Sequence, residues 1–265
     1  MPIEMSIARP WATAANIAEG LLGLVYPRVC ALCSLHRAEA VSGFVCQACR
    51  ERVRRVPDPC CPRCGVPFTG VVPDTAGPCA DCRSAGFSWD HARAAALAEG
   101  VVLECIHRLK YGREPWFATF LSGLLTEAAV PILAGRPIAG IVPVPLHRVR
   151  RREREFNQAE RLARPLAEAL CVPLVTDRVR RRLPTANQAS LGREERRRNV
   201  RSAFEAIGDD RIGGSWIVVD DVLTTGATTD AVAAVLRGLG AEEVSVWAVA
   251  RATLQHGTQT GPIHH

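Results

Sequence analysis

The sequence predicts an α/β fold, a doubly wound parallel sheet preceded by a small cysteine-rich module. Three observations predict this fold. From about residue 90 onward, short apolar runs alternate with segments of helical periodicity, the order expected of parallel strands with helices on both faces. Residues 26–88 combine cysteine, proline and glycine and show little apolar periodicity. No apolar run reaches the ~20 residues needed to span a membrane.

Four segments follow from these patterns. Residues 1–25 carry apolar residues at roughly helical spacing but lack the basic start of a secretory signal, so we expect an amphipathic helical arm that packs on the protein, a partner or a membrane surface. Residues 26–88 predict a module held by metal instead of a core. Residues 90–255 predict the α/β domain, and residues 256–265 a disordered tail. Without a secretory signal or a membrane span, we expect a cytoplasmic protein.

The elements of the α/β domain can be placed in chain order. We expect strands over 92–98, 138–144, 216–221 and 244–250, and helices over 101–110, 116–130, 157–170 and 228–239. Gly240 stands where a left-handed glycine commonly ends a helix. The arginine-rich stretch 178–201 shows no obvious element, and a stretch of that length inside a compact domain is usually functional.

Eight of the eleven cysteines form four C-x-x-C pairs. Thiolates at i and i+3 present two ligands to one metal, and two such pairs complete a tetrahedral zinc site. A disulfide framework would need an oxidising compartment, so we expect two structural Zn²⁺ sites. Cys60 adjoins Cys61 and is an alternative ligand, whereas Cys105 and Cys171 are expected to be buried thiols. The predicted ligands are Cys30, Cys33, Cys46, Cys49, Cys61, Cys64, Cys79 and Cys82.

The apolar run from Ile217 to Val219 ends in two adjacent acids, Asp220 and Asp221, and a threonine-rich loop and a helix follow. Ligands of open α/β sheets bind at the carboxyl ends of the strands, where these acids are expected. The N–H groups at a helix N-terminus favour a phosphate, and glycine permits the tight turn. The alternative is a buried strand followed by a capped turn. The candidate phosphate-binding residues are Thr224, Thr225, Gly226, Ala227 and Thr228.

This stretch resembles the signature of type I phosphoribosyltransferases, which bind phosphoribosyl pyrophosphate (PRPP). The resemblance implies that Asp220 and Asp221 hold the ribose hydroxyls, directly or beside Mg²⁺, and that the loop after them binds the 5-phosphate. It also implies a mobile loop at residues 178–201 that closes over PRPP. The implied reaction is displacement of pyrophosphate at the anomeric carbon, but no residue in the sequence indicates the acceptor.

A second group of candidates follows the predicted strand 138–144. Prolines restrict the backbone there and permit a cis bond, and several arginines come directly after them. Arginine forks bind diphosphates well, and the resembled family binds pyrophosphate at this turn. The alternative is the solvated start of a basic helix. The candidate ligands are Pro145, Leu146, His147, Arg150 and Arg154.

The basic charge is concentrated in one segment. The segment Arg148–Arg201 holds 16 arginines and 7 acidic residues, a balance of +9, although the whole chain carries only +6. This strip suits a nucleotide or single-stranded DNA, but aromatic residues make up only 5% of the chain, so platforms for base stacking are few. Two functions stay open. The chain is either a phosphoribosyltransferase or a non-catalytic module that senses PRPP or a nucleotide and binds single-stranded DNA or a protein.

The cysteine pairs and the phosphoribosyl signature together resemble ComF/GntX-type proteins, which join a double zinc ribbon to a phosphoribosyltransferase domain. Further matches include Leu109–Gly112 and Phe156–Ala159. That family is linked to competence, the uptake of DNA in natural transformation, so the resemblance implies a protein partner in the DNA-uptake machinery. One departure is Glu155, which stands where the family usually has glycine and adds a negative charge beside the proposed diphosphate site.

Overall fold

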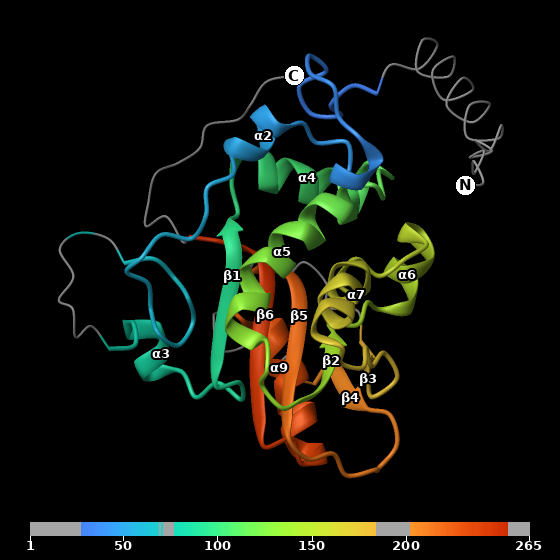
Figure 1. Cartoon of the computed structure of the whole chain (residues 1–265). Helices are drawn as coiled ribbons and strands as arrows, with labels where there is room; N and C mark the ends of the chain where they lie inside the picture. Colours follow the sequence, from blue (N-terminus) through green and yellow to red (C-terminus); the bar gives the residue numbers. More distant parts are fainter. Residues whose placement is uncertain (1–27, 69, 71–76, 184–201, 254–265) are drawn as a thin grey trace, which may run out of the picture.

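The computed structural model describes residues 28–68, 70, 77–183 and 202–253 (Figure 1). The expected helical arm, the part of the arginine-rich stretch after Leu183, and the expected tail lie outside the described residues. Among the residues that are described, no helix combines the length and the apolar character needed to cross a membrane.

Four parallel strands form the main sheet, in the order β1-β6-β5-β2. They are β1 (His91–Leu97), β2 (Ile138–Pro143), β5 (Ser215–Leu223) and β6 (Glu243–Arg251). The two central strands are buried along most of their length, as expected of parallel strands covered on both faces. All four expected strands are confirmed. The strand β5 contains both adjacent acids, as expected, and extends two residues beyond the predicted end.

Helices cover both faces of this sheet (Figure 1). One face carries α5 (Phe117–Leu133) and α7 (Gln158–Leu170), and α4 (Gly100–Tyr111) packs on α5. The other face carries α9 (Ala227–Leu239), which ends at Gly240 in the expected left-handed conformation with φ 110°. The doubly wound arrangement is therefore confirmed.

The chain changes faces between the neighbouring strands β2 and β5. After β2 it continues into α7 on the α5 face, and after β5 it continues into α9 on the opposite face. Ligands of open α/β sheets bind at the carboxyl edge of such a switch point. The fold thus brings the two predicted site segments, which follow β2 and β5, to one place.

A small antiparallel pair of strands lies beside α9. It consists of β3 (Val179–Arg181) and β4 (Phe204–Ala206). The prediction of no element in the arginine-rich stretch is therefore wrong at its start. A three-residue strand with a single buried apolar residue is too short to show alternation, so periodicity could not detect it.

The N-terminal module contains only short regular elements. They are the 3-10 helix η1 (Ala40–Ser42) and the helices α2 (Gln47–Glu51) and α3 (Ala80–Ser84). Its first half lies against α4 and α5, and its second half lies beside β1 (Figure 1). Such short elements bury little apolar surface of their own, which agrees with a module held by its cysteines.

Candidate functional site

Two groups of four cysteines form in the N-terminal module, each from two consecutive C-x-x-C pairs. The first cluster is Cys30, Cys33, Cys46 and Cys49, and the second cluster is Cys61, Cys64, Cys79 and Cys82; within each, all sulfurs lie within 4.8 Å of one another. The Sγ atoms of Cys30 and Cys49 are 3.8 Å apart, and those of Cys64 and Cys79 are 3.7 Å apart. Four sulfurs about 2.3 Å from one Zn²⁺ would be about 3.8 Å apart, so the cysteines fit tetrahedral zinc.

The local backbone prepares one thiol of each cluster for metal binding. Burial alone would raise the pKa of Cys30, but backbone N–H groups such as those of Cys33 and Cys46 lower it to about 6. In the second cluster the pKa of Cys61 is lowered to about 7 in the same way, by the N–H groups of Cys64 and Cys79 against the effect of burial. Since zinc binds thiolates, these bonds favour the binding form of the ligand.

The three remaining cysteines lie outside both clusters. The alternative that Cys60 replaces Cys61 is wrong, because Cys61 belongs to the second cluster and the thiol of Cys60 lies 3.7 Å from Oδ1 of Asp58. Cys105 is fully buried in the core, as expected. Cys171 is exposed, which corrects the prediction, because it lies just beyond α7 where the helix ends in a left-handed residue.

The two acids of β5 meet different partners because successive side chains of a strand point to opposite faces. Asp221 is 8% exposed and forms an ion pair with Lys110 at the end of α4. Asp220 accepts a hydrogen bond from the backbone N–H of Asp221, with a distance of 2.9 Å. The acid pair is therefore already paired with one fixed positive charge.

The pKa of Asp220 is raised to about 7, first because the carboxyl is buried and then because Asp221 is close, although Lys110 opposes the shift. Arg181 of β3 has a lowered pKa through burial and the nearby charge of Arg150, and the charge of Asp220 partly offsets this. The structure thus places Asp220, Arg150 and Arg181 in one electrostatic environment at the carboxyl edge of the sheet.

The threonine-rich loop connects β5 to α9. Thr224 and Thr225 are exposed, and Ala227 and Thr228 are half-buried at the start of the helix. Gly226 has φ 77°, and a Cβ atom there would lie 3.3 Å from the ring of Trp89, so the turn requires glycine. The first turn of a helix leaves its backbone N–H groups without intrahelical partners, and these can bind an anion.

The turn after β2 lies next to this loop, since β2 and β5 are paired. Pro145 and Leu146 are half-buried, and His147 caps α6 (Arg148–Arg154) by accepting from the N–H of Val149 at 3.4 Å. Among the described residues only Asp58–Pro59 has a cis peptide bond, so the proline turn is trans. Asn157 caps α7 and also donates to the carbonyl of Val144 at 3.1 Å, which closes the turn.

The basic residues of the turn occupy α6. Arg150 is exposed, and the guanidinium of Arg154 lies 4.9 Å from the ring centroid of Tyr111, the residue after Lys110. The helix α6 therefore extends toward the end of α4, on the same side as the acid pair. Glu155 ends α6 with φ 64°, a left-handed conformation that explains why glycine is the usual residue of the family pattern here.

Residues 21–83 match the double zinc ribbon domain family, and residues 157–263 match the phosphoribosyl transferase domain family. The DNA utilization protein YhgH of Escherichia coli (strain K12) is 33% identical over 234 residues, covering 86% of this chain and 99% of that protein. Competence protein F of Haemophilus influenzae is 30% identical over 217 residues, covering 78% of this chain and 90% of that protein. The chain belongs to the ComF/GntX family.

A crystal structure of adenine phosphoribosyltransferase also matches, with 20% identity, a TM-score of 0.34 and coverage of 54% of this chain and 74% of that chain. The two family matches, together with the parallel sheet, give the ComF-family chain a type I phosphoribosyltransferase-like α/β domain and a double zinc ribbon. The zinc ribbons account for both cysteine clusters of the structure.

Three residues of this ComF-family site were not assigned a role from the sequence: Lys110, Arg181 and Arg251. Lys110 had a detectable signal, because it is the only lysine among 33 basic residues and lies in the Leu109–Gly112 match. Arg181 lay in a stretch without periodicity. Arg251 ends β6 and is 8% exposed. The residues next to it in the sequence do not indicate which groups it contacts.

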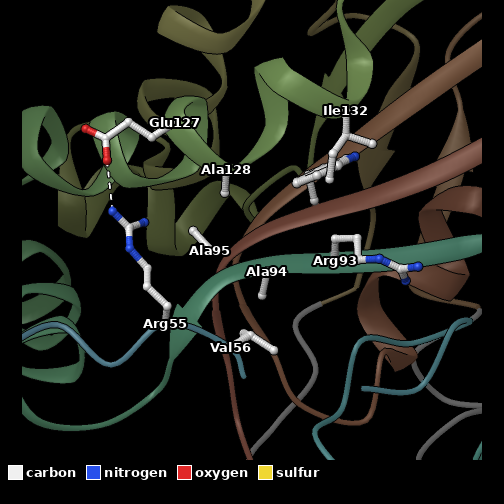
Figure 2. A pocket seen from close by; sticks show the side chains of 9 residues that line it. Arg55, Val56, Arg93, Ala94, Ala95, Glu127, Ala128 and Ile132 are labelled. Carbon is white, nitrogen blue, oxygen red and sulfur yellow. Dashed lines mark hydrogen bonds and ion pairs between the residues drawn. The ribbon is translucent and has the colours of Figure 1, made fainter. Parts of the chain in front are cut away.

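A cavity of about 350 Å³ lies between β1, α5 and the segment that joins the two cysteine clusters (Figure 2). On one side Arg55 pairs with Glu127 at 2.8 Å, and on the other side lies Arg93, which donates to the carbonyl of Pro62 at 2.8 Å. The cavity is at the β1 edge of the sheet, two strands away from β5. It separates two attachments of the zinc module to the α/β domain.

Proposed function

We propose that this ComF-family protein binds PRPP with Mg²⁺ at the carboxyl edge of β2 and β5 and transfers the phosphoribosyl group with loss of pyrophosphate. The observation that carries the proposal is the meeting of two segments far apart in the sequence. The acid pair near the end of β5 and the threonine loop after it lie beside the basic turn after β2. The threonine loop offers N–H groups for a phosphate, and the turn after β2 offers arginines for a diphosphate.

The proposed pose follows from these groups. The loop Thr224–Thr228 binds the 5-phosphate, Asp220 and Asp221 hold the ribose hydroxyls, and the turn with Pro145, Leu146 and His147 binds pyrophosphate together with Arg150 and Arg154. Binding energy from the 5-phosphate, remote from the reacting bond, then orients the anomeric carbon.

In the proposed reaction the bond between the anomeric carbon and the pyrophosphate oxygen breaks, and pyrophosphate leaves with the electron pair. An incoming nucleophile forms the new bond to that carbon and gives up a proton. Positive charge develops on the ribose ring, and the carboxylates of Asp220 and Asp221 stabilise it. The arginines of α6 stabilise the negative charge of the leaving group.

The chain offers suitable ligands for Mg²⁺. Two adjacent carboxylates supply the oxygen ligands that this ion prefers, and the ammonium of Lys110 shows that a positive charge is accommodated against Asp221. When bound, Mg²⁺ would offset the negative charge that develops on the leaving pyrophosphate. Asp220 and Asp221 are the residues that would hold it.

The test combines binding and turnover. PRPP with Mg²⁺ should raise the melting temperature of the full chain, and Asp221→Ala should abolish the shift; an unchanged shift in the variant would refute the site. Pyrophosphate release should then be measured across a panel of nucleobases and amines, with Asp221→Ala as the background. Release above that background with one acceptor identifies the substrate class.

A second function is favoured by the exposed surface of α6, where Arg148, Arg150, Arg151 and Arg152 are all exposed. In this reading the α/β domain senses PRPP or a nucleotide without turnover. The arginines of the strip Arg148–Arg201 bind single-stranded DNA or a protein of the DNA-uptake machinery. The names of the relatives, a DNA utilization protein and a competence protein, support a role in competence.

Salt dependence tests the DNA-binding function. Phosphate-driven binding weakens steeply as salt rises because counterions are released. Binding of a fluorescent single-stranded oligonucleotide should therefore fall between about 50 and 200 mM salt, and Arg151→Gln with Arg152→Gln should reduce the slope. Equal affinity at both salt concentrations would contradict the interaction. DNA binding without release of pyrophosphate from PRPP in the presence of any acceptor would favour the sensing module.

A further inference from the structure

One arginine contacts both the proposed phosphate loop and the second cysteine cluster. Arg251 lies opposite Leu223 in the paired strands β5 and β6 and is 8% exposed. Its Nη1 donates to the carbonyl of Leu223 at 2.7 Å and to the carbonyl of Thr224. Its Nη2 lies 3.8 Å from Sγ of Cys64, within the range of a hydrogen bond to sulfur. A single buried guanidinium thus joins the two sites.

The contacts with the loop fix the direction of two peptide groups. A trans peptide is planar, so its C=O and the following N–H point in opposite directions. Arg251 holds the carbonyls of Leu223 and Thr224 toward the protein interior. The N–H groups of Thr224 and Thr225 therefore point away from Arg251, and both threonines are exposed. These are N–H groups of the loop assigned to the 5-phosphate.

The contact with Cys64 gives the guanidinium a partner of opposite charge when metal is bound. A Zn²⁺ ion with four thiolates carries a net charge of about −2. Loss of the metal removes this anionic centre opposite Arg251. A buried charge without a partner is costly, so the arrangement of Arg251 and of the loop carbonyls depends on metal in the second cluster.

A second connection runs in parallel through aromatic residues. Arg63 donates to the carbonyl of Cys82 at 3.3 Å and to that of Phe87 at 3.2 Å. The ring of Phe87 stacks on Trp89, with centroids 4.1 Å apart. Trp89 in turn lies against Gly226 of the loop. The second cluster therefore supports the loop from two directions.

We propose that Arg251 is a positioning residue that couples metal binding in the second cluster to phosphate binding by the loop Thr224–Thr228. This proposal rests on the proposed function, because it takes the loop as the 5-phosphate site. It assigns the second zinc ribbon a role in ligand binding beyond its own folding. Because coupling is reciprocal, PRPP should also tighten zinc in the second cluster.

The experiment uses the full chain loaded with zinc and the variant Arg251→Met, which keeps the length of the side chain and removes its donors. We expect affinity for PRPP with Mg²⁺, measured by calorimetry, to fall about tenfold or more, since donors of a charged group are lost. In competition with a zinc chelator, PRPP should tighten zinc in the second cluster about fivefold or more in the wild type and not in the variant. Cys82→Ser identifies which zinc belongs to that cluster.

Arg93→Met is the matched control. Arg93 lies on the neighbouring strand β1 and also donates to two carbonyls, one of them Pro62 in the zinc module. It does not contact the loop, so its loss should leave both PRPP affinity and the PRPP effect on zinc unchanged. If Arg251→Met unfolds, Arg251→Lys serves instead, because a lysine keeps the charge but cannot hold two carbonyls and the sulfur at once. It should weaken PRPP binding and the PRPP effect on zinc.

The coupling would be overturned if the Arg251 variants bound PRPP with wild-type affinity. It would also be overturned if Arg93→Met reduced PRPP affinity and the PRPP effect on zinc as much as Arg251→Met does. Failure of the proposed function looks different, because Asp221→Ala would then leave PRPP binding intact. In that case the zinc affinity measured without PRPP still tests whether Arg251 stabilises the second cluster through its contact with Cys64. Weaker zinc in Arg251→Met than in Arg93→Met supports that contact, and equal zinc affinity refutes it.

Discussion

The two cysteine clusters are built alike but contact different parts of the α/β domain. In each, the second C-x-x-C pair begins a short helix, so that Cys46 and Cys79 occupy the same capping position in α2 and α3. In each, backbone N–H groups lower the pKa of the first cysteine, to about 6 for Cys30 and about 7 for Cys61, against the effect of burial. Ligand chemistry therefore does not distinguish them.

Their surroundings do distinguish them. Beside the first cluster, Arg108 of α4 donates to the carbonyl of Ala31 at 2.6 Å. Lys110, two residues further along α4, pairs with Asp221. The second cluster contacts the phosphate loop through Arg251. The first cluster thus supports the acid side of the proposed site through a helix, and the second supports the phosphate side through one side chain, that of Arg251.

The largest expected effect comes from removing one cluster at a time. Cys82→Ser should lose one zinc and the PRPP-dependent rise in melting temperature, because the loop loses its support. Cys49→Ser should also lose one zinc and much stability but keep a measurable PRPP effect. Zinc binding of this kind contributes about 10–16 kcal/mol to folding, so both losses are visible by elemental analysis and thermal unfolding. Equal loss of the PRPP effect in both variants would remove the distinction between the clusters.

The acid side should respond to pH. Burial raises the pKa of Asp220 to about 7, whereas the unfolded chain loses this proton near pH 3.9. The native state therefore binds more protons than the unfolded state in this range, and stability falls as pH rises. Between about pH 6 and 8 the free energy of unfolding should drop by about 1.4 kcal/mol from this group.

The variant Asp220→Asn lacks the titrating group and should not show this drop. Urea unfolding of wild type and variant at both pH values measures this drop. The free energy of unfolding of the variant, relative to that of the wild type, should be larger at the higher pH. A constant difference between the two proteins would show that Asp220 does not titrate between these two pH values.

Lys110 tests the acid side without PRPP. Its ammonium neutralises Asp221, so Lys110→Gln should leave a carboxylate free to bind a divalent cation. Affinity for Mn²⁺ alone should rise about tenfold, the size of effect that an adjacent opposite charge has on a carboxylate. Titration followed by electron paramagnetic resonance measures it. The control is Arg113→Gln, which removes an exposed charge three residues away; an equal rise there would indicate a general effect of charge.

The sequence predicted the four strands of the main sheet and the four longer helices of the α/β domain, because each has its own apolar pattern. The strand β5 and the helix α9 are examples, with the run Ile217–Val219 buried as expected and Gly240 ending the helix. The cysteine spacing likewise predicted both clusters. These are local patterns, and local physics is sufficient to detect them.

The residues that sequence reasoning missed act through contacts between distant segments. Lys110 and Asp221 are separated by more than a hundred positions, and nothing near either residue indicates the other. Arg251 reads as the polar end of a strand, and only the fold shows that its guanidinium meets Cys64. The strand β3 was missed because one buried valine makes no period. The topology of the fold determines which distant residues come into contact, and the periodicity of the sequence carries no information about these contacts.

The smallest expected effect concerns the pyrophosphate side. Glu155 holds a left-handed backbone with φ 64°, a conformation that costs a residue with a Cβ about 1–2 kcal/mol. Glycine loses more entropy on folding, so Glu155→Gly should stabilise the chain by only about 0.5–1 kcal/mol in urea unfolding. It should also tighten pyrophosphate binding slightly, because a negative charge beside the arginines of α6 is removed.

Cys171→Gly is the matched control, since Cys171 is exposed and ends α7 with φ 55°. It should give a similar gain in stability and no change in pyrophosphate affinity, because α7 ends away from the turn after β2. A loss of stability in Glu155→Gly alone would mean that the glutamate side chain contributes more to the turn than its backbone conformation costs. Tighter pyrophosphate binding in both variants would exclude the local effect of the Glu155 charge.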